Sequence, residues 1–182
     1  MRSVNWRLHL PLALLLAAVV HLATIWAYPR VVMRAVLQGL VAMGTAPQPV
    51  YPAPTDHTQR RIVMPSPDLL YALCAYDLTA GPLTVTADPP VPGYWSVALY
   101  ADNTDNFFVV HDRQAGRRPL RLMLLAPGAV PPAAGADGAE VVTAPAARGL
   151  LLMRLLADPT LPLPLLDAAR RTLRCDQPAA SR

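Results

Sequence analysis

The feature that most constrains this chain is one apolar run, Leu8–Tyr28, which contains no formally charged side chain. At a rise of ~1.5 Å per residue, a helix of this length crosses a hydrocarbon core of ~30 Å. Trp6 precedes the run, and Trp26 and Tyr28 end it, at positions where aromatic rings favour the headgroup region. The run therefore predicts one N-terminal membrane-spanning helix within residues 1–28, which anchors the rest of the chain.

A cleaved secretory signal is the alternative interpretation of this run. Such a signal has an apolar stretch of roughly 7–15 residues and small residues two apart before the cut. The run is longer, and a cut after Ala27 or Ala23 would place Ile25 or His21 at the first specificity position. A retained anchor fits better. Within it, His21 is interpreted as a tolerated neutral imidazole, with a proton relay as the alternative.

The arginines that flank the run nearly balance, so the positive-inside rule gives little preference for either orientation. Arg2 and Arg7 precede the run, and Arg30 and Arg34 follow it. A basic start followed by an apolar run is the order found in export signals. We therefore expect a cytoplasmic N-terminus and export of the residues that follow the apolar run, which we call the body of the protein.

The charge and proline content indicate which partners and which secondary structure to expect for the body. All 16 basic residues are arginines, against 12 acidic residues, which gives a net charge of +4. The arginines are scattered without interleaved aromatic residues, which argues against nucleic acid as a partner and favours anionic lipid headgroups. The 21 prolines exclude many long helices and predict a body made mainly of strands and loops.

Residues 29–58 are predicted to connect the anchor to the body. Val31–Met43 reads as a juxtamembrane helix that lies on the bilayer or continues the anchor beyond Pro29. Gly44–Thr58 is rich in proline and is expected to be an extended linker.

Short apolar runs bounded by turn residues predict the strands of the body. They are Leu69–Leu78, Leu83–Ala87, Tyr94–Ala101, Phe107–His111, Leu120–Ala126 and Glu140–Thr143. This regular spacing favours an antiparallel sandwich or barrel. Arg148–Ala157 and Leu165–Leu173 have helical spacing instead and predict two C-terminal helices.

The two cysteines, Cys74 and Cys175, are 101 positions apart. They can form a disulfide in an oxidising compartment, or Cys74 can be a small buried core residue. No Cys-x-x-Cys spacing is present, which excludes zinc-ribbon and thioredoxin-type sites.

An ordered series of short motifs resembles a known family. Ser66-Pro67-Asp68-Leu69-Leu70-Tyr71-Ala72, followed by Asp77-Leu78 and Gly81-Pro82, is similar to the N-P-D-T-L-Y-S and D-L-x-x-G-P signature of the bacterial domain-of-unknown-function 1254 family. The series continues with Gly93-Tyr94-Trp95-Ser96, Asp102, Asn106-Phe107, Asp112-Arg113, Gly116, Ala126-Pro127-Gly128, Ala144-Pro145, Gly149 and Arg154. The resemblance covers roughly residues 45–178.

The resemblance implies an immunoglobulin-like β-sandwich, placed over residues 59–178, in the periplasm of a bacterium. It supplies no reaction, because no activity is established for the family. A second uncharacterised domain, numbered 1214, often accompanies such domains, so a protein that carries it is a candidate partner. Ser66, Leu69 and Gly93 stand where the family pattern has Asn, Thr and Arg.

The candidate ligand-binding residues are Asp68, Tyr71 and Arg113, which are polar and lie in or near turns. Asp68 is also a natural turn residue after Pro67. In a strand, Tyr71 and Asp77 share one face but lie about 20 Å apart, so they cannot form a compact acid–base pair by themselves. No catalytic residue, metal site or cofactor is predicted.

Three further polar features have simpler structural interpretations. Residues 102–106 (DNTDN) are rich in oxygen ligands, but they lack the glycine and distal glutamate of a calcium loop and suit a turn. His111 and Asp112 are adjacent, so on one strand they would point to opposite faces. His57 lies in the predicted linker and is expected to be solvated.

Two hypotheses of function follow. The first is a single-pass inner-membrane protein whose periplasmic β-sandwich is a binding or interaction module, with membrane lipid and an envelope protein as partners. The second is an envelope enzyme that acts on a small apolar or carbohydrate substrate.

Overall fold

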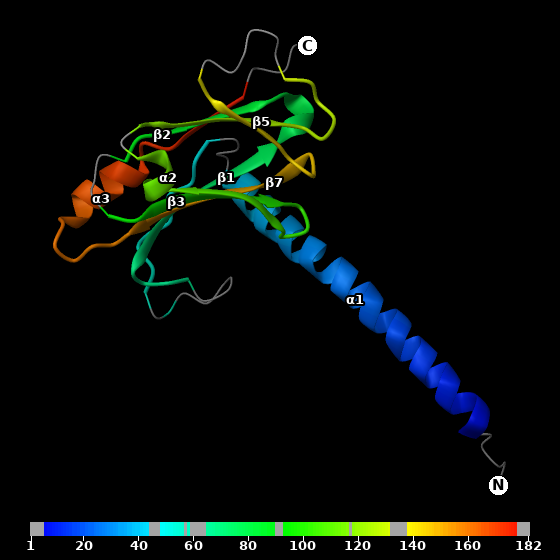
Figure 1. Cartoon of the computed structure of the whole chain (residues 1–182). Coiled ribbons are helices and arrows are strands. Elements are labelled where there is room, and N and C mark those ends of the chain that lie inside the picture. Colours follow the sequence, from blue (N-terminus) through cyan, green and yellow to red (C-terminus); the bar gives the residue numbers. More distant parts are fainter. Residues whose placement is uncertain are drawn as a thin grey trace.

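The computed structural model describes residues 6–43, 48–56, 58, 65–89, 93–116, 118–131 and 138–177. Two four-stranded sheets form the body, and one long helix projects from it (Figure 1). The helices are α1 (Trp6–Ala42), η1 (Leu78–Ala80, a 3₁₀ turn), α2 (Asp112–Ala115) and α3 (Leu163–Arg170). The strands are β1 (Leu69–Asp77), β2 (Leu83–Ala87), β3 (Trp95–Ala101), β4 (Asn106–His111), β5 (Leu120–Leu125), β6 (Glu140–Thr143), β7 (Arg148–Leu156) and β8 (Arg174–Asp176).

The first sheet has the strand order β1-β7-β3-β4, and the second has the order β6-β5-β2-β8. Alternating residues from both sheets fill one core between them. In β2, for example, Leu83, Val85 and Ala87 are buried, whereas the threonines between them are half-buried. The expectation of a mainly β body is therefore confirmed.

The prediction of a wholly antiparallel sandwich is wrong at one pair, because β5 and β6 run parallel. All other strand pairs are antiparallel in the described part of the chain. Parallel neighbours need a crossover of roughly a dozen residues or more, and residues 126–139 provide one of that length.

The predicted helix over Arg148–Ala157 is also wrong, because this segment is strand β7 in the middle of the first sheet. Leu151 and Met153 face the core between the sheets, and Leu150 is buried on the opposite face. A strand covered on both faces reads as a continuous apolar run, which periodicity cannot distinguish from a buried helix. One C-terminal helix, α3, is present, and it ends at Arg170.

Helix α1 continues through Pro29 without a break, so Val31–Met43 extends the anchor and does not lie apart from it. Its 37 residues reach about 55 Å. The part before Pro29 is exposed throughout nearly its whole length, and it is long and apolar enough to cross a membrane, a test that a signal sequence also passes.

The last turns of α1 pack on the outer face of the first sheet. Met33 and Leu40 are buried against Ala75 of β1 and Leu150 of β7, with Leu37 beside them. This contact explains why β7 is apolar on both faces. The helix therefore joins the sheet directly, as Figure 1 shows where α1 meets β1 and β7.

Candidate functional site

Asp68 and Tyr71 lie where the chain enters β1. The Asp68 carbonyl accepts a hydrogen bond from the Ala157 amide at 2.8 Å, and the Asp68 amide donates to Ser66 Oγ at 3.3 Å. The Tyr71 hydroxyl accepts a hydrogen bond from the Ser66 amide at 2.9 Å. Both residues thus help to form the turn that starts the strand.

Arg113 is exposed on α2, which follows β4. Tyr71 is on β1, at the opposite edge of the first sheet, and three strand spacings of about 4.8 Å separate the two strands. The three predicted ligand residues are therefore not brought together, and no described contact links Arg113 to Asp68 or Tyr71.

Asp77 has a local structural role. Its carboxylate accepts hydrogen bonds from the Thr79 amide at 3.1 Å and from Arg148 Nε at 2.7 Å, and it caps η1. Partial burial works to raise the pKa of Asp77, but the hydrogen bonds from Thr79 and Arg148 outweigh it and the pKa lies below its ordinary value.

Residues 102–105 form the turn between β3 and β4, as the composition of residues 102–106 indicates, and Asn106 begins β4. Asn103 Oδ1 accepts from the Asp105 amide at 3.1 Å, and Thr104 has a positive φ of 72°. Among the described residues, no three His, Cys, Asp or Glu side chains gather as a metal site would require.

His111 and Asp112 were expected to point to opposite faces if both lay on one strand, but they do not share a strand. The chain leaves β4 at His111 and turns into α2 at Asp112, which brings His111 Nδ1 to 3.9 Å from Asp112 Oδ1. His57 lies outside the described residues.

The free edge of β1 is closed by a segment that was expected to be only a linker. Val50 forms an antiparallel bridge with Leu73, with both backbone hydrogen bonds present at 2.7 and 2.9 Å. Arg170 is 3% exposed, and its Nη1 donates to the carbonyls of Pro52 at 2.7 Å and Tyr71 at 2.9 Å. We call residues 48–56 the strap, because they tie α1 to β1 and α3.

The buried Arg170 is paired with Asp167 on the same helix. Its Nε donates to Asp167 Oδ1 at 2.7 Å, and its Nη2 contacts the same oxygen. Arg171 Nε donates to the second oxygen of Asp167 at 2.6 Å. The hydrogen bond from Arg171, with that from Arg170, keeps the pKa of Asp167 below its ordinary value.

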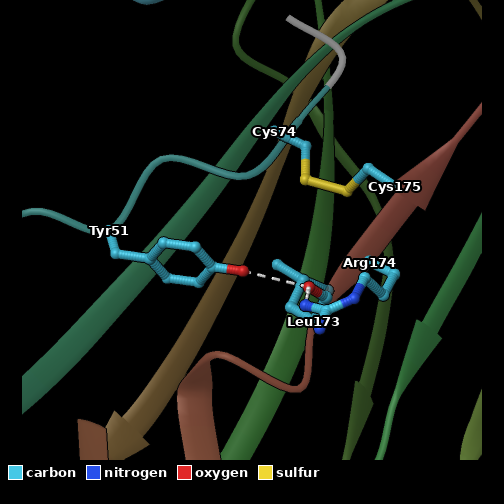
Figure 2. The surroundings of a disulfide bond; sticks show 5 residues. All are labelled: Tyr51, Cys74, Leu173, Arg174 and Cys175. Atoms are coloured by element: carbon cyan, nitrogen blue, oxygen red, sulfur yellow. Dashed lines mark hydrogen bonds between the residues drawn. A yellow bond between two sulfur atoms is a disulfide. The ribbon is translucent and has the colours of Figure 1, made fainter. Parts of the chain in front are cut away.

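A disulfide between Cys74 of β1 and Cys175 of β8 links the two sheets on the side of the sandwich where the strap lies. Figure 2 shows Tyr51 of the strap beside it, with its hydroxyl donating to the Leu173 carbonyl at 3.1 Å. The Arg171 guanidinium stacks 4.7 Å from the Tyr51 ring centre. The question of pairing, which the sequence left open, is thus answered in favour of a disulfide.

Polar side chains also cross the outer face of the first sheet. Tyr71, Arg154, Ser96 and His111 occupy one register row on β1, β7, β3 and β4. Arg154 Nη2 donates to the Tyr100 hydroxyl at 2.9 Å. Tyr100 also packs against the apolar cluster that α1 forms with β1 and β7 on this face, so it connects the polar row to that cluster.

The opposite side of the sandwich is open. A groove of about 350 Å³ lies there, lined by edge strand β4 of the first sheet, by Gln114 and Ala115 of α2, and by β5 with the start of β6 in the second sheet. Apolar residues of β4 and β5 line its floor, and Arg118, Arg121 and Glu140 contribute charges. We call this feature the β4 groove.

Sequence reasoning missed Arg170, Arg154 and the β4 groove. A signal existed for Arg154, since it stands in an otherwise apolar run, yet that run was interpreted as a helix. Arg170 gave no signal of its own, because Arg171 and Arg174 lie close to it in sequence and Arg170 alone of the three is buried. The groove depends on how the two sheets are stacked, which no local pattern encodes.

The comparisons with known proteins bear on the family and the fold. The sequence profile of a family described as "Protein of unknown function (DUF1254)" matches residues 47–177. No curated protein matches. The VPA0106 protein of Vibrio parahaemolyticus has a similar structure, with a TM-score of 0.62 and 16% identity. An uncharacterised protein from Burkholderia cenocepacia follows, with a TM-score of 0.50 and 14% identity.

These similarities cover 84% and 74% of this chain but 36% and 35% of the two solved chains. The chain therefore spans about a third of the length of these structures. The profile match begins one residue before the strap and ends just after β8. The chain belongs to the DUF1254 family of proteins of unknown function.

Proposed function

We propose that this protein is a single-pass protein of the bacterial inner membrane whose periplasmic domain is a binding module of the cell envelope. Helix α1 supplies contact with membrane lipid. The immunoglobulin-like description of the sandwich belongs to this proposal, as does a partner that carries the companion 1214 domain.

The single observation that carries the proposal is that the anchor helix packs against strand β1 and that the disulfide is attached to the same strand. The outer face of β1 receives α1 at Ala75, and its inner face bears Cys74, which is bonded to Cys175. Disulfides persist in oxidising compartments and are rare in the cytosol. A covalent link in a domain held directly against an apolar helix supports an exported, membrane-attached domain.

The interface between α1 and the domain also supports a positional role. A flexible tether would let the domain reach partners in many orientations, whereas docked residues such as Met33 and Leu40 hold it in one. Near the predicted lipid boundary, the Arg30 guanidinium stacks 4.4 Å from the Trp26 ring, an arrangement suited to a headgroup region. A module held in this way presents fixed surfaces to other envelope components.

The test is the topology of the full chain. An alkaline phosphatase fused after Arg182 is expected to be active and to sediment with membranes after carbonate washing. A matched fusion to a green fluorescent protein that does not mature after export should be dark. An inactive phosphatase with a fluorescent partner fusion would place the domain in the cytoplasm and overturn the proposal.

Alkylation of the cysteines gives an independent readout. When the protein is unfolded in the presence of a maleimide reagent, Cys74 and Cys175 should stay unmodified until a reductant is added, and unfolding is needed because both are buried in the folded domain. The Cys175→Ala variant should expose Cys74 to the reagent after unfolding and serves as the positive control. Full labelling of the wild-type protein without reductant would contradict an oxidising location.

A further inference from the structure

The two sides of the sandwich, where the edge strands of the sheets lie, differ in how far the strand edges are covered. On the side of β1 and β8, the disulfide, the Val50 bridge and the Arg170 hydrogen bonds cover the strand edge. On the side of β4 and β6, the described residues leave the β4 groove open. Closure of one edge and exposure of the other indicate that the exposed one has a different role.

Strand β4 is an exposed edge strand with a β-bulge near its start, where the partner of Leu99 is Phe108 and the partner of Tyr100 is Asn106. Among the described residues it forms strand pairs with β3 and with no other strand. Its sequence, Asn106–His111 (NFFVVH), contains no proline, lysine or acidic residue, and Val109 is 45% exposed. Natural proteins usually block exposed edge strands with charges, prolines or bulges, and β4 has only the bulge near its start. The rest of the strand, from Phe108 to His111, can pair with an added strand.

The charges that line the β4 groove favour acidic side chains. Arg118 and Arg121 are exposed, and neither forms an ion pair in the part of the chain that the structure describes. Glu140 is the one acidic residue in the lining. Beneath these charges, Val110 and Leu120 are buried and give the groove an apolar floor.

We propose that the β4 groove binds an extended, acidic segment of a partner protein, which adds as a strand beside β4. Alternate side chains of that segment would face the apolar floor, and acidic ones would reach Arg118 and Arg121. This inference rests on the proposed function as a binding module.

The probe for a direct test is a fluorescent decapeptide of alternating glutamate and valine, measured by anisotropy with the full chain in detergent. It should bind, whereas the lysine–valine peptide should not. Methylation of alternate backbone amides on one edge of the peptide should weaken binding at least tenfold, because strand addition needs those donors. Equal binding of the acidic and basic peptides would overturn the proposal.

Variants of the groove provide matched controls. The double variant Arg118→Glu with Arg121→Glu should weaken binding of the acidic peptide more than tenfold. Glu140→Lys should strengthen it several-fold. Asp176→Lys makes the same charge change at an exposed position on β8, at the opposite edge of the second sheet from the groove, and should leave the affinity unchanged. If Asp176→Lys and Glu140→Lys act alike, the effect is general electrostatic attraction and the site is not the β4 groove.

Photocrosslinking in cells separates failure of this inference from failure of the proposed function. A benzophenone residue at Val109 should crosslink to an acidic segment of another protein, and the adduct should disappear in the double arginine variant. A second probe at Tyr94, exposed on the outer face of the first sheet, serves as the comparison. Adducts at Tyr94 but none at Val109 would keep the binding module and refute the groove. No adduct at either position would count against both.

Discussion

The contribution of the buried Arg170 to stability can be measured against its exposed neighbour. Both Arg170 and Arg171 donate to the carboxylate of Asp167, but their side chains are 4% and 52% exposed. Arg170 alone also donates to the carbonyls of Pro52 and Tyr71. The pair therefore compares a buried and an exposed arginine on one shared acceptor.

We expect Arg170→Ala to lower the free energy of unfolding by about 3 kcal/mol. Two partly buried carbonyls lose a donor, at about 1 kcal/mol or more each, and Asp167 loses one of its two partners. Arg171→Ala removes an exposed ion pair and should cost about 0.2–1 kcal/mol. Arg170→Lys keeps the charge but cannot reach both carbonyls and Asp167 with one ammonium group, so it should fall between the two.

The assay is thermal unfolding of the full chain in detergent, followed by near-ultraviolet circular dichroism. For a chain of this size, the Arg170→Ala shift in Tm should be about 6–12 °C. Hydrogen exchange should rise along β1 in the same variant, because Val50 and the strap lose their attachment. Equal shifts for Arg170→Ala and Arg171→Ala would show that burial adds nothing and would refute the reasoning.

The low pKa of Asp167 adds a pH dependence to the same cluster. Because the folded pKa lies below the unfolded value of about 4, the contribution to stability is complete above that value and is lost as the pH falls through the folded pKa. Melts between pH 6 and pH 3 should fall less steeply for Asp167→Asn than for the wild type. An identical slope in both would contradict this assignment.

Three further perturbations test other parts of the fold. Replacing Cys74 and Cys175 together by alanine should cost up to about 4.7 kcal/mol, since the disulfide closes a 101-residue loop, and a melt with and without reductant would check this. Gly149→Ala should cost about 3 kcal/mol because a Cβ there would lie 2.1 Å from a backbone oxygen. Gly39→Ala, where a Cβ meets nothing, should instead be neutral or stabilising in denaturant titrations, and the reverse order would refute the packing argument. Leu40→Ala should weaken docking of α1 by about 2–4 kcal/mol while the sandwich stays folded, seen as faster proteolysis between α1 and the body; unchanged cleavage would contradict the docked helix.

Local sequence patterns were sufficient to predict those elements whose structure is determined by one dominant physical effect. The apolar run before Pro29 had to form a helix long enough to cross a membrane, and it does. Strands such as β2 and β5 alternate clearly between core and solvent, so period and turn residues located them. The turn at residues 102–105 followed from its polar composition in the same way.

The tertiary structure decided the features whose signals are ambiguous or distant in sequence. Strand β7 reads as a helix because both of its faces are buried, one by the second sheet and one by α1, which the local sequence cannot reveal. The parallel pairing of β6 and the choice of Arg170 over its neighbouring arginines for burial depend on contacts across many residues. The same is true of the disulfide and of the β4 groove. The sequence by itself determined which segments are apolar, extended or turning, and only the stacking of the sheets determined which side chains meet, because that depends on three-dimensional proximity.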